Sequence, residues 1–263
     1  MEHTPIAIDL SAYPAAFHTL LSGARLFDSS STGHSGATTI FIDKDDGYFL
    51  KSAPRGTLAQ QAAMTRFLHG KGLAAEVLAY ESAASDWLLT ARVPGEDCTA
   101  AMYLEQPERL ADILAEQLYD LHHTDFTGCP SPNQTEAYLA LAKHNYQTGR
   151  YDKSLFPDNW GYDTAEEAYA VLENRSHCLQ TDTLIHGDYC LPNIILDNWR
   201  FSGFIDVDGG GIGDRHIDLF WGIWSLWFNT KSDRYRERFI NAYGKADVDE
   251  ERLRIVAAAE VFG

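Results

Sequence analysis

The sequence predicts an α+β protein, with a small β-rich lobe at the amino terminus and a larger, mainly helical lobe behind it. At 263 residues the chain is long enough for two lobes or one large domain. Strand-like runs occur in residues 1–92, whereas apolar residues at helical spacing prevail after residue 97. Residues 94–97 (PGED) break both patterns, so we expect lobes at 1–93 and 98–263 joined by a hinge at 94–97.

The first lobe is expected to contain three strands and one helix. Residues 37–43 (ATTIFID) and 47–52 (GYFLKS) are separated by a polar turn and predict an antiparallel hairpin. Residues 57–73 place apolar side chains at helical spacing and end near two glycines, as a helix would. Residues 86–93 (DWLLTARV) predict a further strand.

The second lobe is expected to consist mostly of helices. Residues 107–123 carry leucine and isoleucine side chains on one face, which predicts an amphipathic helix. Residues 164–179 and 214–230 show a similar pattern, and residues 232–263 indicate two more helices. A cleft between two such lobes would be a common kind of ligand site.

Composition and charge exclude several classes of function. A formal net charge of −17 would repel nucleic acid and suits a cationic ligand, although an ordinary acidic surface is the simpler explanation. The most apolar window, residues 217–228, is too short to span a bilayer, and the amino terminus lacks a signal-peptide pattern. Four cysteines form no CxxC pair, which favours reduced thiols. We therefore expect a cytoplasmic protein, a monomer or weak dimer, that binds neither membrane nor nucleic acid.

Polar residues stand at fixed intervals between apolar runs in the last third of the chain. The two segments concerned read HGDYCLPNIILDN (186–198) and FIDVDGGGIGD (204–214). Asp188 and Asn193 lead into a short apolar strand, which can pair with residues 201–206 across a tight turn at 197–198. This hairpin would bring Asp206 beside Asp188 and Asn193.

These side chains suit the chemistry of phosphoryl transfer. Asn and Asp oxygens are ligands for Mg²⁺, which completes its shell with phosphates and water. A further carboxylate that the metal does not need could orient a substrate hydroxyl and accept its proton. His, Gly and Asp also form ordinary turns. A turn alone, however, does not explain the HGDxxxxN spacing with FID downstream.

The spacing of Asp188, Asn193 and Asp206 resembles the catalytic loop of protein kinases. With HGD in place of HRD and LPNIILDNWRFSGFID behind it, the segment is similar to the aminoglycoside phosphotransferases, most closely to their 3′-phosphotransferase branch. Further segments carry the resemblance: GYFLKS, DWLLTARVPGED, LHHTDFTGCP and GDRHIDLF. It covers most of the chain and implies a bilobal, protein-kinase-like fold, with a nucleotide-binding lobe before a catalytic and acceptor-binding lobe.

The resemblance also implies roles for individual residues. Asp188 would be the catalytic base or orient the acceptor hydroxyl, and Asn193 and Asp206 would bind Mg²⁺. Lys51 would contact the α- and β-phosphates of ATP, and His186 would support the loop. A bracing role in the catalytic loop, through hydrogen bonds, is implied for Asp214, Arg215 and Asp218.

Two departures from the family's pattern concern the nucleotide site. In kinases of this kind a glutamate on the first helix pairs with the strand lysine, but the position that fits is Gln61. A neutral amide can hold Lys51 by one hydrogen bond without the strength of a charge-assisted pair, which predicts weaker nucleotide binding or turnover. Residues 207–214 also lack the arginine that 3′-phosphotransferases usually place soon after the metal-binding aspartate.

The third departure from the family's pattern concerns the carboxylates that bind a cationic acceptor. Aminoglycosides are polyamines, and the family supplies carboxylates from a helical insertion before HGD and from the carboxyl terminus. The acceptor-binding candidates in this chain are Asp158, Asp163, Glu260 and the terminal carboxylate of Gly263. Glu166 and Glu167 are also available, but stabilisation of a helix start explains them more simply.

The sequence thus predicts an ATP- and Mg²⁺-dependent O-phosphotransferase that transfers the γ-phosphoryl group to an aminoglycoside antibiotic, at its 3′-hydroxyl. Such an enzyme would confer antibiotic resistance. Two alternatives stay open: a kinase for another small hydroxylated metabolite, such as an amino alcohol or sugar, and a nucleotide-binding protein without useful catalysis. Gln61 motivates both alternatives. A protein that only binds nucleotide, however, has little need for Asp188 as a base.

Overall fold

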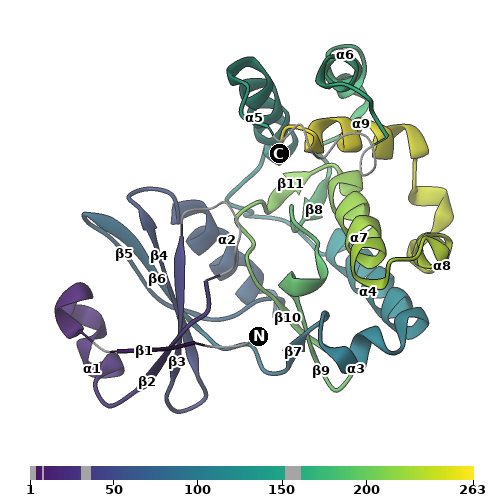
Figure 1. Cartoon of the computed structure of the whole chain (residues 1–263). Coiled ribbons are helices and arrows are strands. Elements are labelled where there is room, and N and C mark those ends of the chain that lie inside the picture. Colours follow the sequence, from purple (N-terminus) through teal and green to yellow (C-terminus); the bar gives the residue numbers. More distant parts are fainter. Residues whose placement is uncertain (1–3, 8, 31–36, 152–160) are drawn as a thin grey trace. The chain divides into compact units, whose positions relative to one another are not determined.

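The computed structural model describes residues 4–7, 9–30, 37–151 and 161–263 (Figure 1). The chain divides into two compact units, of which the first is Met1–Gly95 with Ser202–Asp208 and the second is Glu96–Phe201 with Gly209–Gly263. The first unit is built on a sheet and the second mainly on helices, which confirms the predicted α+β class. The nucleotide-binding and acceptor-binding roles of the two lobes, and the hinge at 94–97, stay predictions.

An antiparallel sheet of six strands, in the order β1-β2-β3-β4-β6-β5, forms the first unit. Its strands are β1 (Thr4–Ile6), β2 (Arg25–Asp28), β3 (Thr38–Asp43), β4 (Tyr48–Pro54), β5 (Val77–Ser82) and β6 (Ser85–Ala91). The predicted hairpin is β3 and β4, whose register pairs Thr39 with Lys51. Its turn contains Asp45 and Gly47 at positive φ. The central strands bury Ile40, Ile42 and Leu50 in the sheet's core.

The predicted helix of the first unit is α2 (Ala59–His69), which is shorter than the expected 57–73. Gly72, at φ +74°, lies in the turn that follows the helix. At the other end, the backbone N–H of Leu58 donates to the buried carboxylate of Asp86 at 2.9 Å. A carboxylate there stabilises the helix start, because it satisfies a backbone donor and complements the helix dipole. Two 3₁₀ turns, η1 (Leu10–Ala12) and η2 (Ala15–Phe17), and one short helix, α1 (His18–Leu21), precede the sheet's second strand.

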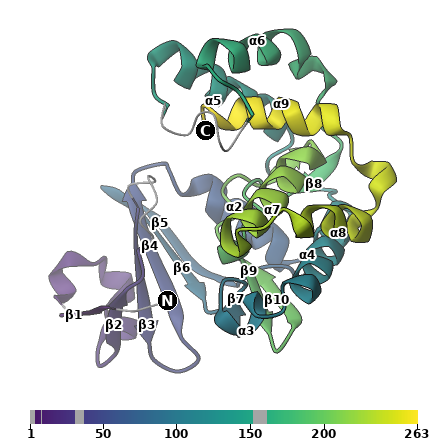
Figure 2. The same ribbon diagram turned by 45° about the vertical axis from the view of Figure 1, so that its right-hand side comes forward.

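The second unit contains seven helices within its described residues: α3 (Ala101–Leu104), α4 (Pro107–His122), α5 (Gln134–Thr148), α6 (Ala165–Arg175), α7 (Arg215–Thr230), α8 (Arg234–Tyr243) and α9 (Glu250–Glu260). The prediction for 107–123 is confirmed as α4, whose buried face includes Leu110, Leu114 and Leu118. The helix predicted over 164–179 ends early, at Arg175, and continues as the 3₁₀ turn η4 (Ser176–Cys178). Figure 2 shows α5, α6 and α9 gathered at one end of the unit.

Short strands carry the predicted motif. β8 (Thr183–Ile185) pairs with β11 (Gly211–Gly213), and β9 (Ile194–Asp197) lies between β7 (Glu96–Asp97) and β10 (Arg200–Phe204). The turn between β9 and β10 places Asn198 and Trp199 at positive φ, as a tight hairpin turn requires. The predicted hairpin behind the HGD segment is therefore confirmed, but its turn lies at 198–199 and not at 197–198, and its second strand is 200–204 and not 201–206. No helix within the described part of the chain is long and apolar enough to cross a membrane.

Candidate active site

The segment from His186 to Asn193 leaves β8 as a loop and enters β9 through the 3₁₀ turn η5 (Leu191–Asn193). Gly187 stands at φ +84°, and a Cβ atom at this position would lie only 1.9 Å from the carbonyl oxygen of Gly209. Two backbone segments therefore approach so closely that no larger residue fits without movement. The glycine of HGD is required by this packing.

Asp218 of α7 fixes the same loop through its backbone. The carboxylate is fully buried and accepts from the N–H groups of His186 and Gly187, each at 2.7 Å. His122 Nε2 lies 3.2 Å from Asp218 Oδ2. Charge-assisted hydrogen bonds in a buried setting are strong. Asp218 thus braces the loop, as predicted.

Asp214 and Arg215 act at the start of α7, and this corrects the bracing role in the loop expected for both. Asp214 is the N-cap of the helix, accepting from His216 N–H at 2.8 Å, and it also accepts from Gln180 N–H at 2.6 Å. Arg215 pairs with Asp247 at 3.5 Å. Their contacts stabilise the helix that carries Asp218.

Asp188 and Asn193 meet directly, as the sequence predicts. Asn193 Nδ2 donates to Asp188 Oδ2 at 2.8 Å and to the Asp188 carbonyl oxygen at 3.0 Å. Because the amide nitrogen is used in this way, the amide oxygen of Asn193 is the atom suited to a cation.

The second carboxylate oxygen of Asp188, Oδ1, accepts a hydrogen bond from the Cys190 thiol at 3.0 Å. Burial raises the pKa of this thiol, and the negative charge of Asp188 raises it further. A thiol with a raised pKa holds its proton and is a poor nucleophile. These contacts indicate that Cys190 is a packed thiol and not a nucleophile.

Asp206, Lys51 and Gln61 form a cluster within the first unit. Lys51 Nζ donates to Asp206 Oδ1 at 2.8 Å, and Gln61 Nε2 donates to the same oxygen at 2.9 Å. In this structure the amide nitrogen of Gln61 holds the aspartate, and a hydrogen bond between Gln61 and Lys51 stays a prediction. Asp206 also adopts φ +52°, a conformation uncommon for a residue with a side chain.

The predicted magnesium ligands come from both units. Asp206 belongs to the first unit, whereas Asn193 belongs to the second, as does the proposed base Asp188, and the assembly of these residues into one site stays a prediction. A carboxylate and an amide oxygen fit a hard cation such as Mg²⁺. Within the described ranges, no group of three or more His, Cys, Asp or Glu residues is placed to hold a metal ion.

Glu260, at the end of α9, is a buried carboxylate in the second unit. It is 7% exposed, and its Oε1 accepts from Tyr138 Oη at 2.7 Å and from Trp221 Nε1 at 3.0 Å. Burial raises the pKa of Glu260 to about 7, and the negative charge of Asp188 contributes to the shift.

Two of the remaining acceptor candidates, Asp163 and Gly263, are exposed. Asp163 is exposed, and its N–H donates to Glu167 at 3.2 Å, beside the Thr164 cap of α6. This contact agrees with the simpler interpretation of Glu167 as a helix-start residue. Gly263 is exposed behind the buried Phe262, whose carbonyl oxygen accepts from Asn145 at 2.7 Å. Asp158 lies outside the described residues.

Sequence reasoning missed the two donors to Glu260. Trp221 follows Asp218 by three positions on α7, and this helical spacing was an available signal that both face the same side. Tyr138 lies on α5, a helix that the sequence pattern does not predict. No local signal connects it with the carboxyl terminus.

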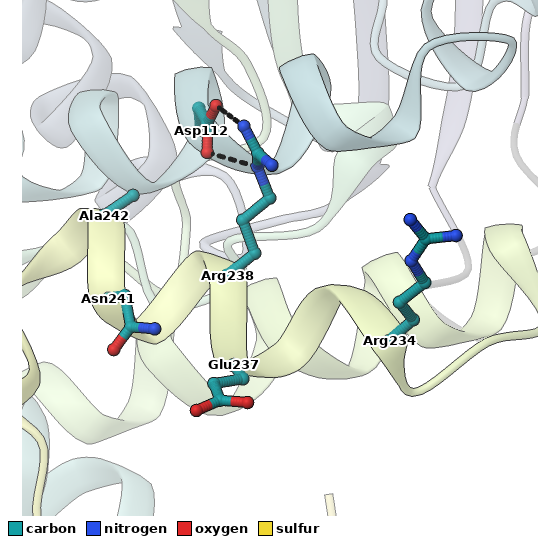
Figure 3. A pocket seen from close by; sticks show the side chains of 6 residues that line it. All are labelled: Asp112, Arg234, Glu237, Arg238, Asn241 and Ala242. Atoms are coloured by element: carbon teal, nitrogen blue, oxygen red, sulfur yellow. Dashed lines mark hydrogen bonds and ion pairs between the residues drawn. The ribbon is translucent and has the colours of Figure 1, made fainter.

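A shallow hollow in the second unit has a volume of about 520 Å³ and lies between α4 and α8. Figure 3 shows its lining residues, Asp112, Arg234, Glu237, Arg238, Asn241 and Ala242. Arg238 points across it to Asp112, with Nε 2.7 Å from Oδ1 (Figure 3). None of the predicted site residues lines this hollow, and it has no part in the chemistry predicted for the chain.

Comparisons with known proteins find similarity over nearly the whole length of the chain. The model of the phosphotransferase enzyme family matches residues 31–256. A relative from Lactococcus lactis subsp. lactis (strain IL1403), a probable aminoglycoside 3′-phosphotransferase, is 46% identical over 259 residues, which are 98% of this chain and 98% of the relative.

Two solved structures are similar in fold. An aminoglycoside-3′-phosphotransferase of type VIII has a TM-score of 0.79 and 25% identity and covers 96% of both chains. An aminoglycoside phosphotransferase from Streptomyces rimosus ATCC10970, in complex with ADP and streptomycin, has a TM-score of 0.73 and 22% identity, covering 97% of this chain and 99% of that one. These similarities confirm the fold class that the sequence predicts.

Proposed function

The chain belongs to the phosphotransferase enzyme family, and we propose that it transfers the γ-phosphoryl group of ATP to the 3′-hydroxyl of an aminoglycoside. The predicted resemblance to the aminoglycoside phosphotransferases is confirmed by the 46% identical relative. The chain is thus a phosphotransferase whose acceptor is a hydroxyl group. The donor nucleotide, the acceptor and its reacting hydroxyl belong to the proposal.

The arrangement of Asp188 carries the proposal. Its carboxylate is held by Asn193 and Cys190, on a loop whose backbone is fixed by buried Asp218. A carboxylate held in one orientation can align the acceptor hydroxyl for in-line attack and accept its proton as the bond to phosphorus forms.

The phosphate groups require positive charge. Lys51 would contact the α- and β-phosphates, and Asn193 and Asp206 would bind Mg²⁺ through their oxygens. Bound there, the cation would neutralise charge on the phosphates during transfer. The bound ADP of the Streptomyces rimosus protein, which has the same fold, supports a nucleotide as the donor.

The acceptor would be recognised by its ammonium groups. The charge of Asp188 contributes to the raised pKa of Glu260, and an ammonium group bound at Glu260 would hold the acceptor in the same unit as the proposed base. Asp163, Asp158 and the terminal carboxylate of Gly263 would add negative charge around a polycation.

The test is ATP turnover by the purified protein with Mg²⁺ and a panel of acceptors. Kanamycin should stimulate turnover well above the rate without acceptor, whereas tobramycin, which lacks a 3′-hydroxyl, should not. Asp188→Ala should abolish the stimulation while nucleotide binding persists. Stimulation by choline or homoserine alone would favour another metabolite as acceptor. Nucleotide binding without any stimulated turnover would favour a protein that binds only.

A further inference from the structure

The side-chain amide of Gln61 is placed on the proposed metal-binding aspartate. Gln61 lies in the first turn of α2 and is only 5% exposed. Its Nε2 and the ammonium of Lys51 both donate to Asp206 Oδ1, at 2.9 and 2.8 Å. The amide and the ammonium are therefore neighbours on one carboxylate oxygen.

The other end of this amide is an acceptor without a donor. Within the part of the chain that the structure describes, Gln61 Oε1 is buried and has no hydrogen-bond partner. Exchanging the amide oxygen and nitrogen would not remove the problem, because an oxygen would then face Asp206 Oδ1. Nearly all buried polar groups in native proteins are paired, so this acceptor indicates a second arrangement in which a donor reaches it.

Lys51 is the donor that this arrangement offers. Its ammonium carries three N–H donors. Because its side chain is only 16% exposed, few positions outside the cluster are open to the ammonium. One donor occupies Asp206 Oδ1. When Lys51 turns to the phosphates of a nucleotide, another of its donors can meet Gln61 Oε1.

We propose that Gln61 is a positioning residue that bridges Lys51 and Asp206 in the nucleotide-bound enzyme, an inference that rests on the proposed function. Its Nε2 keeps Asp206 in place after Lys51 turns away, and its Oε1 accepts a hydrogen bond from Lys51. A glutamate cannot do both, because an ionised carboxylate has acceptors only. At this position it would pair with Lys51 and repel Asp206.

A glutamate at position 61, the residue that the family usually has there, should therefore impair Mg²⁺-dependent nucleotide binding in this protein. Gln61→Glu should reduce the gain in nucleotide affinity brought by Mg²⁺ by about tenfold. The affinity without Mg²⁺ should change by less than about threefold. Calorimetric titration with a non-hydrolysable ATP analogue, with and without Mg²⁺, measures both. A residue with only a structural role would not separate the two affinities.

Two further variants keep the test decisive. Gln147→Glu makes the same chemical change at an exposed position of α5 and should match the wild type in both affinities. Gln61→Met keeps the volume but removes both polar atoms, so it should also lose the Mg²⁺-dependent gain. It provides the test if the glutamate variant does not fold, as checked by thermal unfolding.

The proposed bridge is contradicted if Gln61→Glu keeps the wild-type gain in nucleotide affinity brought by Mg²⁺. It is also contradicted if this variant turns over ATP faster than the wild type, which is the result expected of a restored lysine–glutamate pair. If the variants lose this dependence while the wild type phosphorylates no aminoglycoside, the bridge stands and the proposed function fails. A crystal structure with the bound analogue should place Lys51 Nζ about 3 Å from Gln61 Oε1. A wider separation there would contradict the bridge.

Discussion

At the scale of single residues, the proposed base depends on its donors. Asp188 receives a hydrogen bond from Asn193 on one oxygen and from the Cys190 thiol on the other. Asn193 is expected to bind a cation as well, so Cys190 is the partner whose contact with Asp188 can be removed separately. A thiol is a weak donor, yet it restrains the carboxylate's rotation.

Removal of this thiol should slow the proposed reaction moderately. Cys190→Ala should lower kcat by about two- to twelvefold, the equivalent of one ordinary hydrogen bond. Cys190→Ser should stay within about threefold of the wild type, because a hydroxyl can donate to the same oxygen. Steady-state kinetics with a saturating acceptor measure both. Equal losses in the two variants would show that packing of the sulfur, and not its hydrogen bond, matters.

Glu260 should make the protein less stable as pH rises. Burial raises its pKa from 4.5 to about 7 in the folded state, so between these values the folded protein binds more protons than the unfolded chain. Its contribution to the free energy of unfolding is therefore greatest below pH 4.5 and falls by about 3 kcal/mol as pH rises through 7.

Glu260→Gln isolates this contribution, because an amide does not titrate. Urea unfolding at pH 5 and pH 8 should show a larger loss of stability in the wild type than in the variant. The difference between the two losses should be about 2.5 kcal/mol, because a small part of the change lies below pH 5. Parallel curves for the two proteins would mean that Glu260 ionises normally.

At the scale of elements, the strongest periodic patterns were predictable and the weaker ones were not. The helix α4 and the hairpin β3–β4 follow from apolar spacing and a polar turn within their own residues. In contrast, α5 buries only Thr135 and Ala142, so its sequence carries little helical periodicity. Its position depends on distant contacts, such as that of Tyr138 with Glu260.

The contacts of the candidate site likewise include some that sequence spacing predicted and some that it could not predict. Asp188 and Asn193 are five positions apart on one loop, so spacing alone predicted their meeting. The contact of Gln61 with Asp206 spans 145 positions of sequence, and no local pattern contains it. Likewise, the partners of Glu260 come from α5 and α7, which sequence spacing cannot bring together.

The close approach of two backbone segments at Gly187 should make this position intolerant of alanine. Gly187→Ala adds a clash with Gly209 to the strain of a positive φ, and it should destabilise the protein by about 3 kcal/mol or more. Gly128→Ala is the matched control, because Gly128 has a similar φ of +82° but open space around it. It should cost about 1–2 kcal/mol, from the strain alone.

Chemical denaturation of both variants separates clash from strain. The Gly187 variant should also lose most phosphotransferase activity, because the loop carrying Asp188 must move. The Gly128 variant should retain it. Equal destabilisation by the two substitutions would indicate that the loop at Gly187 moves aside at little cost.

At the scale of the whole molecule, a net charge of −17 is the property most relevant to a cationic acceptor. A strongly acidic protein attracts polycations over a distance, and dissolved salt screens that attraction. The KM for kanamycin at pH 8 should therefore rise about three- to tenfold between 50 mM and 500 mM KCl. The value of kcat at saturating acceptor should change little, because the chemical step occurs after binding.

Glu260→Gln distinguishes the general field from a direct contact. Loss of the Glu260 charge should raise KM at every salt concentration. If salt acts mainly on the field of the whole surface, the dependence of KM on salt should stay nearly unchanged in the variant. If the ion pair with Glu260 dominates, the dependence should become shallower, because one direct charge contact is lost. The buried position of Glu260 favours the first outcome, since a pair sheltered from solvent is screened less than the surface charges around it.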